Sequence, residues 1–173
     1  IPKSFEDAAT DGERWRWCLV QAMELNPQLV NRVHYQFAQF LKQQFGVQTM
    51  AYYRYLFNKT PAEGDKSGPY ALHTLAENET VARLATGVQR FTFPDEFNYI
   101  RILQELVKAG GGYAQNACND LAALFTNRRQ YPRAVEYWKL SIKKFGPGRN
   151  NYKQKQIDQI QKNWGRFEAV MTQ

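Results

Sequence analysis

The chain has few of the residues from which a chemical function is usually recognised. Its 173 residues include only two cysteines and two histidines. Cys18 and Cys118 lie far apart within apolar helical patterns, which excludes a disulfide-dense scaffold and predicts two buried thiols. His34 and His73 fall in different segments, and neither forms a zinc-binding pattern with the cysteines. We therefore expect no metal site and no cofactor.

Long apolar runs and catalytic signatures are also missing. No run approaches the roughly 20 apolar residues of a membrane-spanning helix, so we expect no membrane insertion by this segment. No Ser, His and Asp pattern suggests a nucleophile, and the acids Asp95, Glu96 and Glu105 are typical of helix starts and surfaces. The glycines at 110–112 lack the lysine of a phosphate-binding loop and follow a helical pattern instead of a strand. The sequence favours a non-catalytic protein over an enzyme.

The apolar content is nevertheless sufficient for a folded core. Hydrophobic residues make up 43% of the chain and aromatic residues 14%, which excludes a disordered protein. The length suits one domain or one compact array of repeats. The chain starts at Ile1 without a charged and apolar leader, which fits either a processed protein or a part of a longer one.

Apolar residues recur at three- and four-residue steps along most of the chain, which predicts an all-α fold of about seven or eight helices. The expected helices span 11–25, 27–45, 48–57, 71–90, 94–107, 113–129, 132–145 and 152–163. We expect a flexible loop at 58–70, where prolines and glycines gather. The helical repeats form a single domain over 1–163, and 164–173 is a tail that leads towards a following domain.

Helix-boundary signals support this assignment. Asn26 and Pro27 end the first helix, and Pro94 followed by two acids is a typical helix start. The 71–90 helix is the least regular of the set, since Asn78 is a candidate cap in its middle and Gly87 weakens its continuation. We find no two-residue alternation of apolar and polar residues that would predict a sheet.

The segment from Cys118 to Pro147 resembles the tetratricopeptide repeat, a pair of antiparallel helices of about 34 residues. The matching positions are Leu121, Ala122, Phe125, Ala134, Trp138, Ser141 and Pro147. Cys118 stands where tryptophan is usual, and Arg129 where glycine is common. A second partial match begins at "WCLVQAMELNP", whereas 51–108 does not fit the repeat. The resemblance implies a right-handed α-solenoid, that is, a stack of antiparallel helix pairs.

Whole phrases resemble a narrower family. "YALHTLAENETVARLATGVQRF", "NRRQYPRAVEYW" and "NNYKQKQIDQIQKNWGRFE" are similar to the helical N-terminal region of bacterial α2-macroglobulin-like proteins of planctomycete type. The resemblance implies a fragment of an exported, periplasmic or membrane-attached protein that traps proteases. The reactive Cys-Gly-Glu-Gln thioester of that family is absent from this chain, so no trapping chemistry is expected of any residue here.

Positive charge is concentrated in one segment. The segment from Arg128 to Lys155 contains nine basic residues and one acid, Glu136, so its net charge is +8. The whole chain has a net charge of +7, and the rest of it therefore carries −1. Ala134, Trp138, Ser141 and Phe145 share one helical face, which we expect to point inward while the charges point outward.

The basic segment has three interpretations: a solvated outer face, a docking surface for a protein or a neighbouring domain, and a nucleic-acid site. No nucleic-acid-binding motif is present, and Trp138 is committed to the core. We therefore expect a non-catalytic scaffold for protein–protein or interdomain binding, with a nucleic-acid-binding module as the alternative. The expected contact residues are Arg128, Arg129, Arg133, Lys139 and Lys143.

Overall fold

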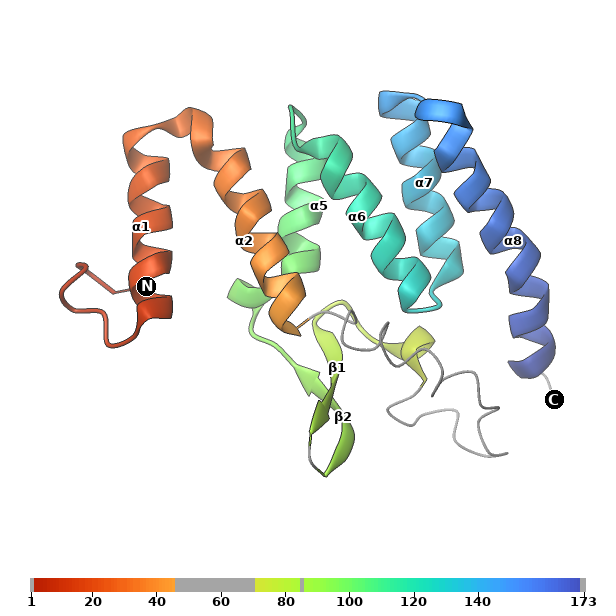
Figure 1. Ribbon diagram of the computed structural model, residues 1–173, viewed down its shortest axis with the longest axis horizontal. Helices are drawn as coiled ribbons and strands as arrows, with labels where there is room; N and C mark the ends of the chain where they lie inside the picture. Colours follow the sequence, from red (N-terminus) through yellow and green to blue (C-terminus); the bar gives the residue numbers. More distant parts are fainter. Residues whose placement is uncertain (1, 46–70, 85, 172–173) are drawn as a thin grey trace.

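The computed structural model describes residues 2–45, 71–84 and 86–171. Within these ranges six α-helices follow one another in a single row, and a β-hairpin lies to one side of it (Figure 1). The helices are α1 (Asp11–Leu25), α2 (Val30–Phe45), α5 (Tyr99–Ala109), α6 (Ala114–Asn127), α7 (Tyr131–Phe145) and α8 (Tyr152–Met171). The strands are β1 (Glu79–Leu84) and β2 (Gly87–Thr92), and short 3-10 turns are η1 (Pro27–Leu29), η2 (Leu72–Thr74), η3 (Asp95–Phe97) and η4 (Arg149–Asn151). The predicted helical character of the chain is confirmed.

The predicted helix at 71–90 is wrong, because this segment forms η2 and the hairpin. The strands pair antiparallel, with Val81 opposite Arg90 and Thr80 opposite Phe91. Thr80 and Val81 are buried, and β-branched and aromatic side chains of this kind favour a strand. Asn78 does not cap a helix; its carbonyl instead accepts a hydrogen bond from the Phe93 amide at 2.9 Å, at the open end of the hairpin.

The helix predicted to start at Pro94 begins only at Tyr99, because Pro94 precedes the 3-10 turn η3 and Asn98 caps α5. Several other helix boundaries agree with the sequence signals. Thr10 caps α1 in a capping box with Glu13, and the cap at its other end is Asn26. The predicted end of the last helix at residue 163 is wrong, because α8 continues to Met171. That 164–173 leads towards a following domain stays a prediction. The predicted helix at 48–57 and the predicted loop at 58–70 lie outside the described residues.

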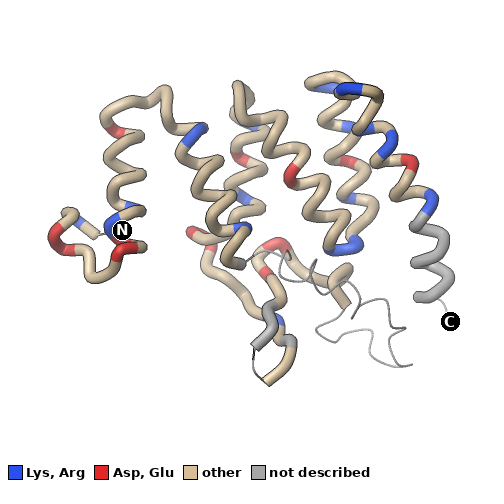
Figure 2. The backbone as a smooth tube through the Cα atoms, in the orientation of Figure 1, with Lys and Arg blue, Asp and Glu red and all other residues tan. Residues whose placement is uncertain are grey.

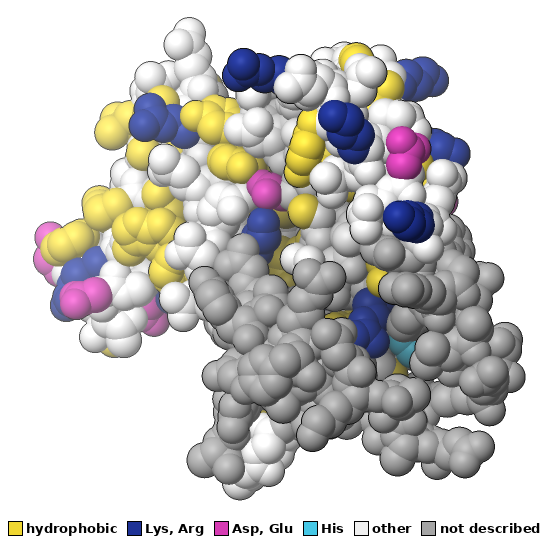
Figure 3. Space-filling view, turned by 45° about the vertical axis from the view of Figure 1, so that its right-hand side comes forward, with side chains coloured by type: hydrophobic (Ala, Val, Ile, Leu, Met, Phe, Trp, Pro, Cys, Tyr) yellow, Lys and Arg dark blue, Asp and Glu magenta, His cyan; other side chains and the backbone are white. Residues whose placement is uncertain are grey.

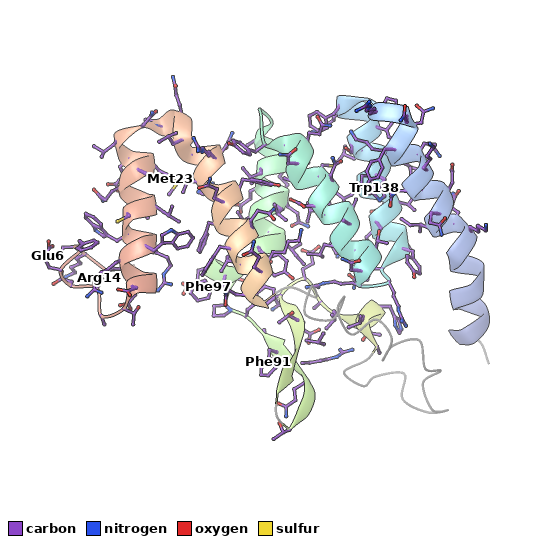
Figure 4. All side chains as sticks on the ribbon, viewed as in Figure 1. Glu6, Arg14, Met23, Phe91, Phe97 and Trp138 are labelled. Atoms are coloured by element: carbon purple, nitrogen blue, oxygen red, sulfur yellow. The ribbon has the colours of Figure 1, made fainter. Side chains whose placement is uncertain are left out.

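The most extensive contact between helices joins α6 to α7. Ala134 and Ser141 are completely buried on α7, so two small side chains allow the helices to approach closely. Trp138 lies between them along the same face and is 2% exposed, and Leu121 of α6 belongs to the same core cluster (Figure 4). The predicted inward face of α7 is therefore confirmed for these residues, whereas Phe145 is only partly buried.

A polar cluster joins α2 to α6. Asp120 of α6 accepts hydrogen bonds from Tyr35 Oη at 2.8 Å, Gln39 Nε2 at 2.6 Å and Lys42 Nζ at 3.1 Å, all on α2. Burial, together with the adjacent carboxylate of Asp120, raises the pKa of Tyr35 well above its usual range. Three donors from successive turns of one helix thus hold a single carboxylate on its neighbour.

The first helix of the row is the least buried. No residue of α1 is buried, although Met23 points from α1 towards α2 (Figure 4). The ring of Trp15 contacts Phe40 of α2, with 4.7 Å between centroids. Cys18 is exposed on α1, so the prediction of a buried thiol is wrong for this residue. The periodicity correctly identified the helix, but α1 has a neighbour on one side of the row only.

Cys118 is buried in α6, as predicted. Its thiol donates to the Tyr137 carbonyl at 3.2 Å, and burial raises the pKa of the thiol, which disfavours the reactive thiolate. We expect a thiol-specific reagent to modify Cys18 in the native protein and to modify Cys118 at least ~100-fold more slowly. A Cys18→Ser variant isolates the second reaction, and two fast-reacting thiols in the folded protein would contradict the assignment.

Removing the Trp138 side chain should leave a cavity at the α6–α7 contact. We expect Trp138→Ala to lower the free energy of unfolding by about 3 kcal/mol, measured by chemical denaturation. Glu136→Ala, two residues away on the exposed face of α7, is the control and should change stability by less than ~0.5 kcal/mol. A loss below ~1 kcal/mol for Trp138→Ala would show that this face is not a core face.

Candidate functional site

The predicted basic segment runs from the end of α6 through α7 and η4 into the first turn of α8. The structure separates its nine cations by exposure: Arg128 and Lys153 are buried, Arg129 and Arg133 are partly buried, and Lys139, Lys143, Lys144, Arg149 and Lys155 are exposed. The cations of this segment therefore have two different roles. Some of its cations hold the fold together, and others face solvent.

Arg128 does not lie on the surface, so its prediction as a contact residue is wrong. Its side chain is 0% exposed. One terminal nitrogen donates to the Ala76 carbonyl at 3.0 Å, and the other donates to the Glu79 carbonyl at 2.8 Å and to Tyr99 Oη at 3.1 Å. A planar guanidinium can reach several oxygens at once, so one residue links α6, α5 and the start of the hairpin. Burial raises the pKa of Tyr99, and the charge of Arg128 acts against that effect.

Gln130 continues the attachment of the 71–79 segment. Its side-chain amide donates to the Leu75 carbonyl at 2.7 Å and to the His73 carbonyl at 3.3 Å. Arg128 and Gln130 together donate to carbonyls from η2 to the first residue of β1. Sequence reasoning missed Gln130, because only the folded chain brings it to this distant segment.

Arg133 is engaged in an ion pair with Glu77. Its guanidinium also lies over the ring of Phe125, 4.2 Å from the centroid. Glu77 accepts a further hydrogen bond from Gln104 Nε2 at 3.1 Å. This predicted contact residue is thus partly used within the fold, where it links α7 to the segment before β1.

Arg129 occupies the turn between α6 and α7. Its φ of 57° lies in the left-handed region, which agrees with the observation that glycine is common at this position of the repeat. The Arg129 amide donates to the Thr126 carbonyl and the Gln130 amide to the Phe125 carbonyl, the two bonds of a Schellman motif. A non-glycine residue in this conformation costs about 1 kcal/mol, so the turn accepts some backbone strain. Arg129, with Arg90, also adds to the effect of burial in lowering the pKa of His73.

Lys153 is buried at the turn between α7 and α8. Its Nζ donates to the Gly146 carbonyl at 2.8 Å and to the Ser141 carbonyl at 3.3 Å. These bonds satisfy carbonyls near the C-terminal end of α7, where a cation is favoured by the helix dipole. Burial lowers the pKa of Lys153, and Cys118 opposes this shift. The lysine fixes the turn that carries Arg149.

Four exposed cations remain on this part of the molecule: Lys139, Lys143, Arg149 and Lys155, which we name the basic surface. None of them has an ion-pair or hydrogen-bond partner among the residues that the structure describes. Lys144 is left out of this set, because its Nζ lies 3.4 Å from the Val107 carbonyl. Figure 2 shows the basic positions gathered on α7, η4 and α8.

Few acids balance the basic surface. Within 131–162 the exposed carboxylates are those of Glu136 and Asp158, and Asp158 accepts a hydrogen bond from Gln154. Figure 3 shows dark blue side chains at several points over the part of the molecule formed by α7 and α8. Lys139 and Lys143 are four residues apart on one helical face, a rise of about 6 Å. The predicted residues Lys139 and Lys143 therefore lie where a partner can reach them.

Three other features of the described residues bear on function: possible metal ligands, helix length and apolarity, and an open depression. No group of three or more histidine, cysteine or acidic side chains in 2–45, 71–84 and 86–171 could hold a metal ion. None of the described helices is long and apolar enough to cross a membrane. An open depression of about 420 Å³ is lined by Asp95, Glu96, Arg101, Ile102 and Glu105. Arg101 already pairs with Asp95 and Glu105, so this cluster is an ion-pair network at the start of α5.

Comparisons with protein-family models, curated proteins and solved structures find no match to this chain.

The position of Arg128 predicts a large effect on stability. In Arg128→Met the volume is largely kept, but the carbonyls of Ala76 and Glu79 and the hydroxyl of Tyr99 lose the guanidinium as a donor. We expect a loss of about 3 kcal/mol in the free energy of unfolding. The amides of 79–81 should also exchange faster with solvent, because β1 loses its anchor.

Arg149→Met removes an exposed arginine and serves as the matched control, with an expected change below ~0.5 kcal/mol. Equal effects of the two substitutions would show that the buried contacts of Arg128 do not stabilise the fold.

Proposed function

We propose that this protein is a non-catalytic helical scaffold that binds an acidic protein surface, on another protein or on a neighbouring domain of its own polypeptide. The observation that carries the proposal is the basic surface, four exposed cations that no described acid neutralises. Clustered charge of one sign increases the rate of encounter with a partner of opposite charge and orients it.

The architecture supports binding by a preformed surface. Lys139 and Lys143 lie on a helix whose opposite face is locked by Trp138, Ala134 and Ser141. Lys153 ties the following turn to the end of α7, so Arg149 is presented from a fixed backbone. Binding of a partner therefore orders few further groups of this surface and loses little conformational entropy. This is the main advantage of a rigid scaffold in recognition.

A tetratricopeptide-like stack is part of the proposal. Small buried residues at Ala134 and Ser141, and a tight left-handed turn at Arg129, are what the repeat requires where its two helices meet. The row of α5, α6, α7 and α8 is compatible with successive antiparallel pairs (Figure 1). The hairpin at 79–92 departs from a pure helical repeat and interrupts it between α2 and α5.

The resemblance to bacterial α2-macroglobulin-like proteins gives this binding a context. In such a protein the fragment would be exported, and its helical region would dock onto other domains of the same chain. We retain this as a proposal that rests on sequence phrases alone. It predicts no chemistry for this segment, since the thioester residues are absent.

Nucleic acid is the competing partner, since phosphates also seek exposed lysines and arginines. Single-stranded binding usually adds aromatic side chains on which bases stack. Trp138 is buried, and among the aromatic side chains that the structure describes on α7 and α8 Tyr152 alone is largely exposed, so at most one ring is open to a base. This distribution favours a protein partner.

The binding proposal is tested with a fluorescent, glutamate-rich helical peptide and fluorescence anisotropy. We expect Lys139→Glu/Lys143→Glu to raise Kd for this peptide at least ~10-fold at ~50 mM salt, since two surface attractions become repulsions. The matched control is Lys3→Glu/Arg32→Glu, which changes the net charge equally at exposed positions outside the basic surface.

A peptide with glutamine in place of glutamate should not bind. Equal weakening by both double variants would mean that only net charge matters and would contradict a defined surface. An oligonucleotide of equal charge that binds more tightly than the peptide, with a steep salt dependence, would favour the nucleic-acid function instead.

A further inference from the structure

Charge is distributed unequally between the two ends of the helical row. Residues 2–16, the segment before α1 and its first turns, contain four acids, Glu6, Asp7, Asp11 and Glu13, against Lys3, Arg14 and Arg16, a net charge of −1. The basic surface lies at the opposite end, on α7, η4 and α8 (Figure 2). Six helices spaced about 8–10 Å apart separate these ends by more than the ~8 Å Debye length at physiological salt. Each end therefore presents its own local field to a partner.

The acidic end is an ordered structure. Ala8 is 3% exposed and anchors the segment, and its amide lies 3.4 Å from the Phe5 carbonyl. The Glu13 carboxylate accepts the Ala9 and Thr10 amides at 2.7 and 3.1 Å, so this acid is used within the fold. Glu6 and Asp7 are exposed and have no ion-pair partner among the described residues (Figure 4). Asp11 is also exposed, but it pairs with Arg14 at 2.7 Å, and the Arg14 guanidinium lies 5.9 Å from the centre of the Phe5 ring. We therefore name Glu6 and Asp7 the acidic edge.

Among the side chains that the structure describes, each end has one exposed aromatic ring near its charges. Phe5 is 42% exposed beside Glu6, and its ring packs against Trp17 with 5.9 Å between centroids. Tyr152 is 52% exposed between Arg149 and Lys155, and its ring packs against Trp138 at 5.8 Å. Rings that are already held in place lose little freedom on binding, and aromatic residues are frequent anchors of interfaces.

We propose that the basic surface of one molecule binds the acidic edge of a second copy of this chain, in a head-to-tail contact. This inference rests on the proposed function and identifies one partner of the same surface. One contact region is basic and the other is acidic, and each has an exposed aromatic side chain. Such a contact needs this complementarity. Because the two regions lie at opposite ends of one molecule, the contact is heterologous, and each added copy leaves both kinds of end free.

Sedimentation velocity of the whole chain over a range of concentrations tests the contact. We expect reversible association at ~50 mM salt that weakens at least ~10-fold at ~300 mM, since the charges are exposed and screened. Lys139→Glu/Lys143→Glu should abolish association, because two glutamates against Arg149 and Lys155 leave the basic surface without net charge. Glu6→Lys/Asp7→Lys should abolish it by making both ends basic. Arg32→Glu, an exposed reversal on α2, is the control and should associate like the unaltered chain.

The decisive experiment mixes the two reversed variants in equal amounts. The first retains the original acidic edge and the second retains the original basic surface, so the mixture should associate although each variant alone is monomeric. A mixture that stays monomeric, or a reversed variant that still associates alone, overturns the head-to-tail contact. Neutral variants, Lys139→Gln/Lys143→Gln and Glu6→Gln/Asp7→Gln, repeat the single-variant measurements without repulsion and keep the inference testable if a reversal impairs folding.

The result separates this inference from the proposed function. An unaltered chain that binds the glutamate-rich peptide but is monomeric at ~50 mM salt overturns only the self-association. A chain that associates but ignores the peptide restricts the function to self-association. A chain that does neither overturns both.

Discussion

The guanidinium of Arg128 is the contact on which the arrangement of this molecule depends. It lies at the end of α6, where it donates to the carbonyls of Ala76 and Glu79 and to the hydroxyl of Tyr99. A buried charge without hydrogen-bond acceptors would be very unfavourable, so these three oxygens must stay in place for the helix to end where it does. The hairpin can therefore not leave the helical row without exposing an unsatisfied cation. One side chain couples the only described strands to the helices that carry the basic surface.

Lys153, at the turn between α7 and α8, is a second buried cation that needs hydrogen-bond acceptors. Its ammonium donates to the carbonyls of Gly146 and Ser141 at the end of α7. Burial opposes its charge, and the carbonyl bonds and the negative end of the helix dipole favour it. The buried cation of this turn and its exposed cation thus have different roles. Lys153 determines where the backbone lies, and Arg149, four residues earlier, gains a fixed position in solvent.

The helices and their inner faces could be predicted from the sequence, because apolar residues recur at helical spacing and caps such as Thr10 act locally. The same periodicity also indicates which cations of the basic segment are buried. Arg128 follows Leu121 and Phe125 at helical steps, and Lys153 precedes Ile157 and Ile160 in the same way, so both lie on inner faces. Net charge by segment cannot separate such residues from their exposed neighbours. The hairpin was missed because Asn78 and Gly87 suggest a broken helix as readily as a strand boundary, and its pairing depends on partners such as Arg128, about 50 residues away in the chain.

The basic surface is smaller than the sequence suggests, and under the proposed function this restricts the partners that fit it. A net charge of +8 spread along one segment would attract any polyanion, whereas four cations at fixed positions on α7, η4 and α8 favour a partner whose acids match their spacing. Arg128, Arg133 and Lys153 do not belong to this surface, because their side chains bind other groups within the fold. The cations that stabilise the structure therefore also define the surface, since they fix the helices and the turn from which Lys139, Lys143, Arg149 and Lys155 project. A substitution that releases a buried cation would add charge to the outside and, at the same time, remove the rigidity that gives the outer charges their positions.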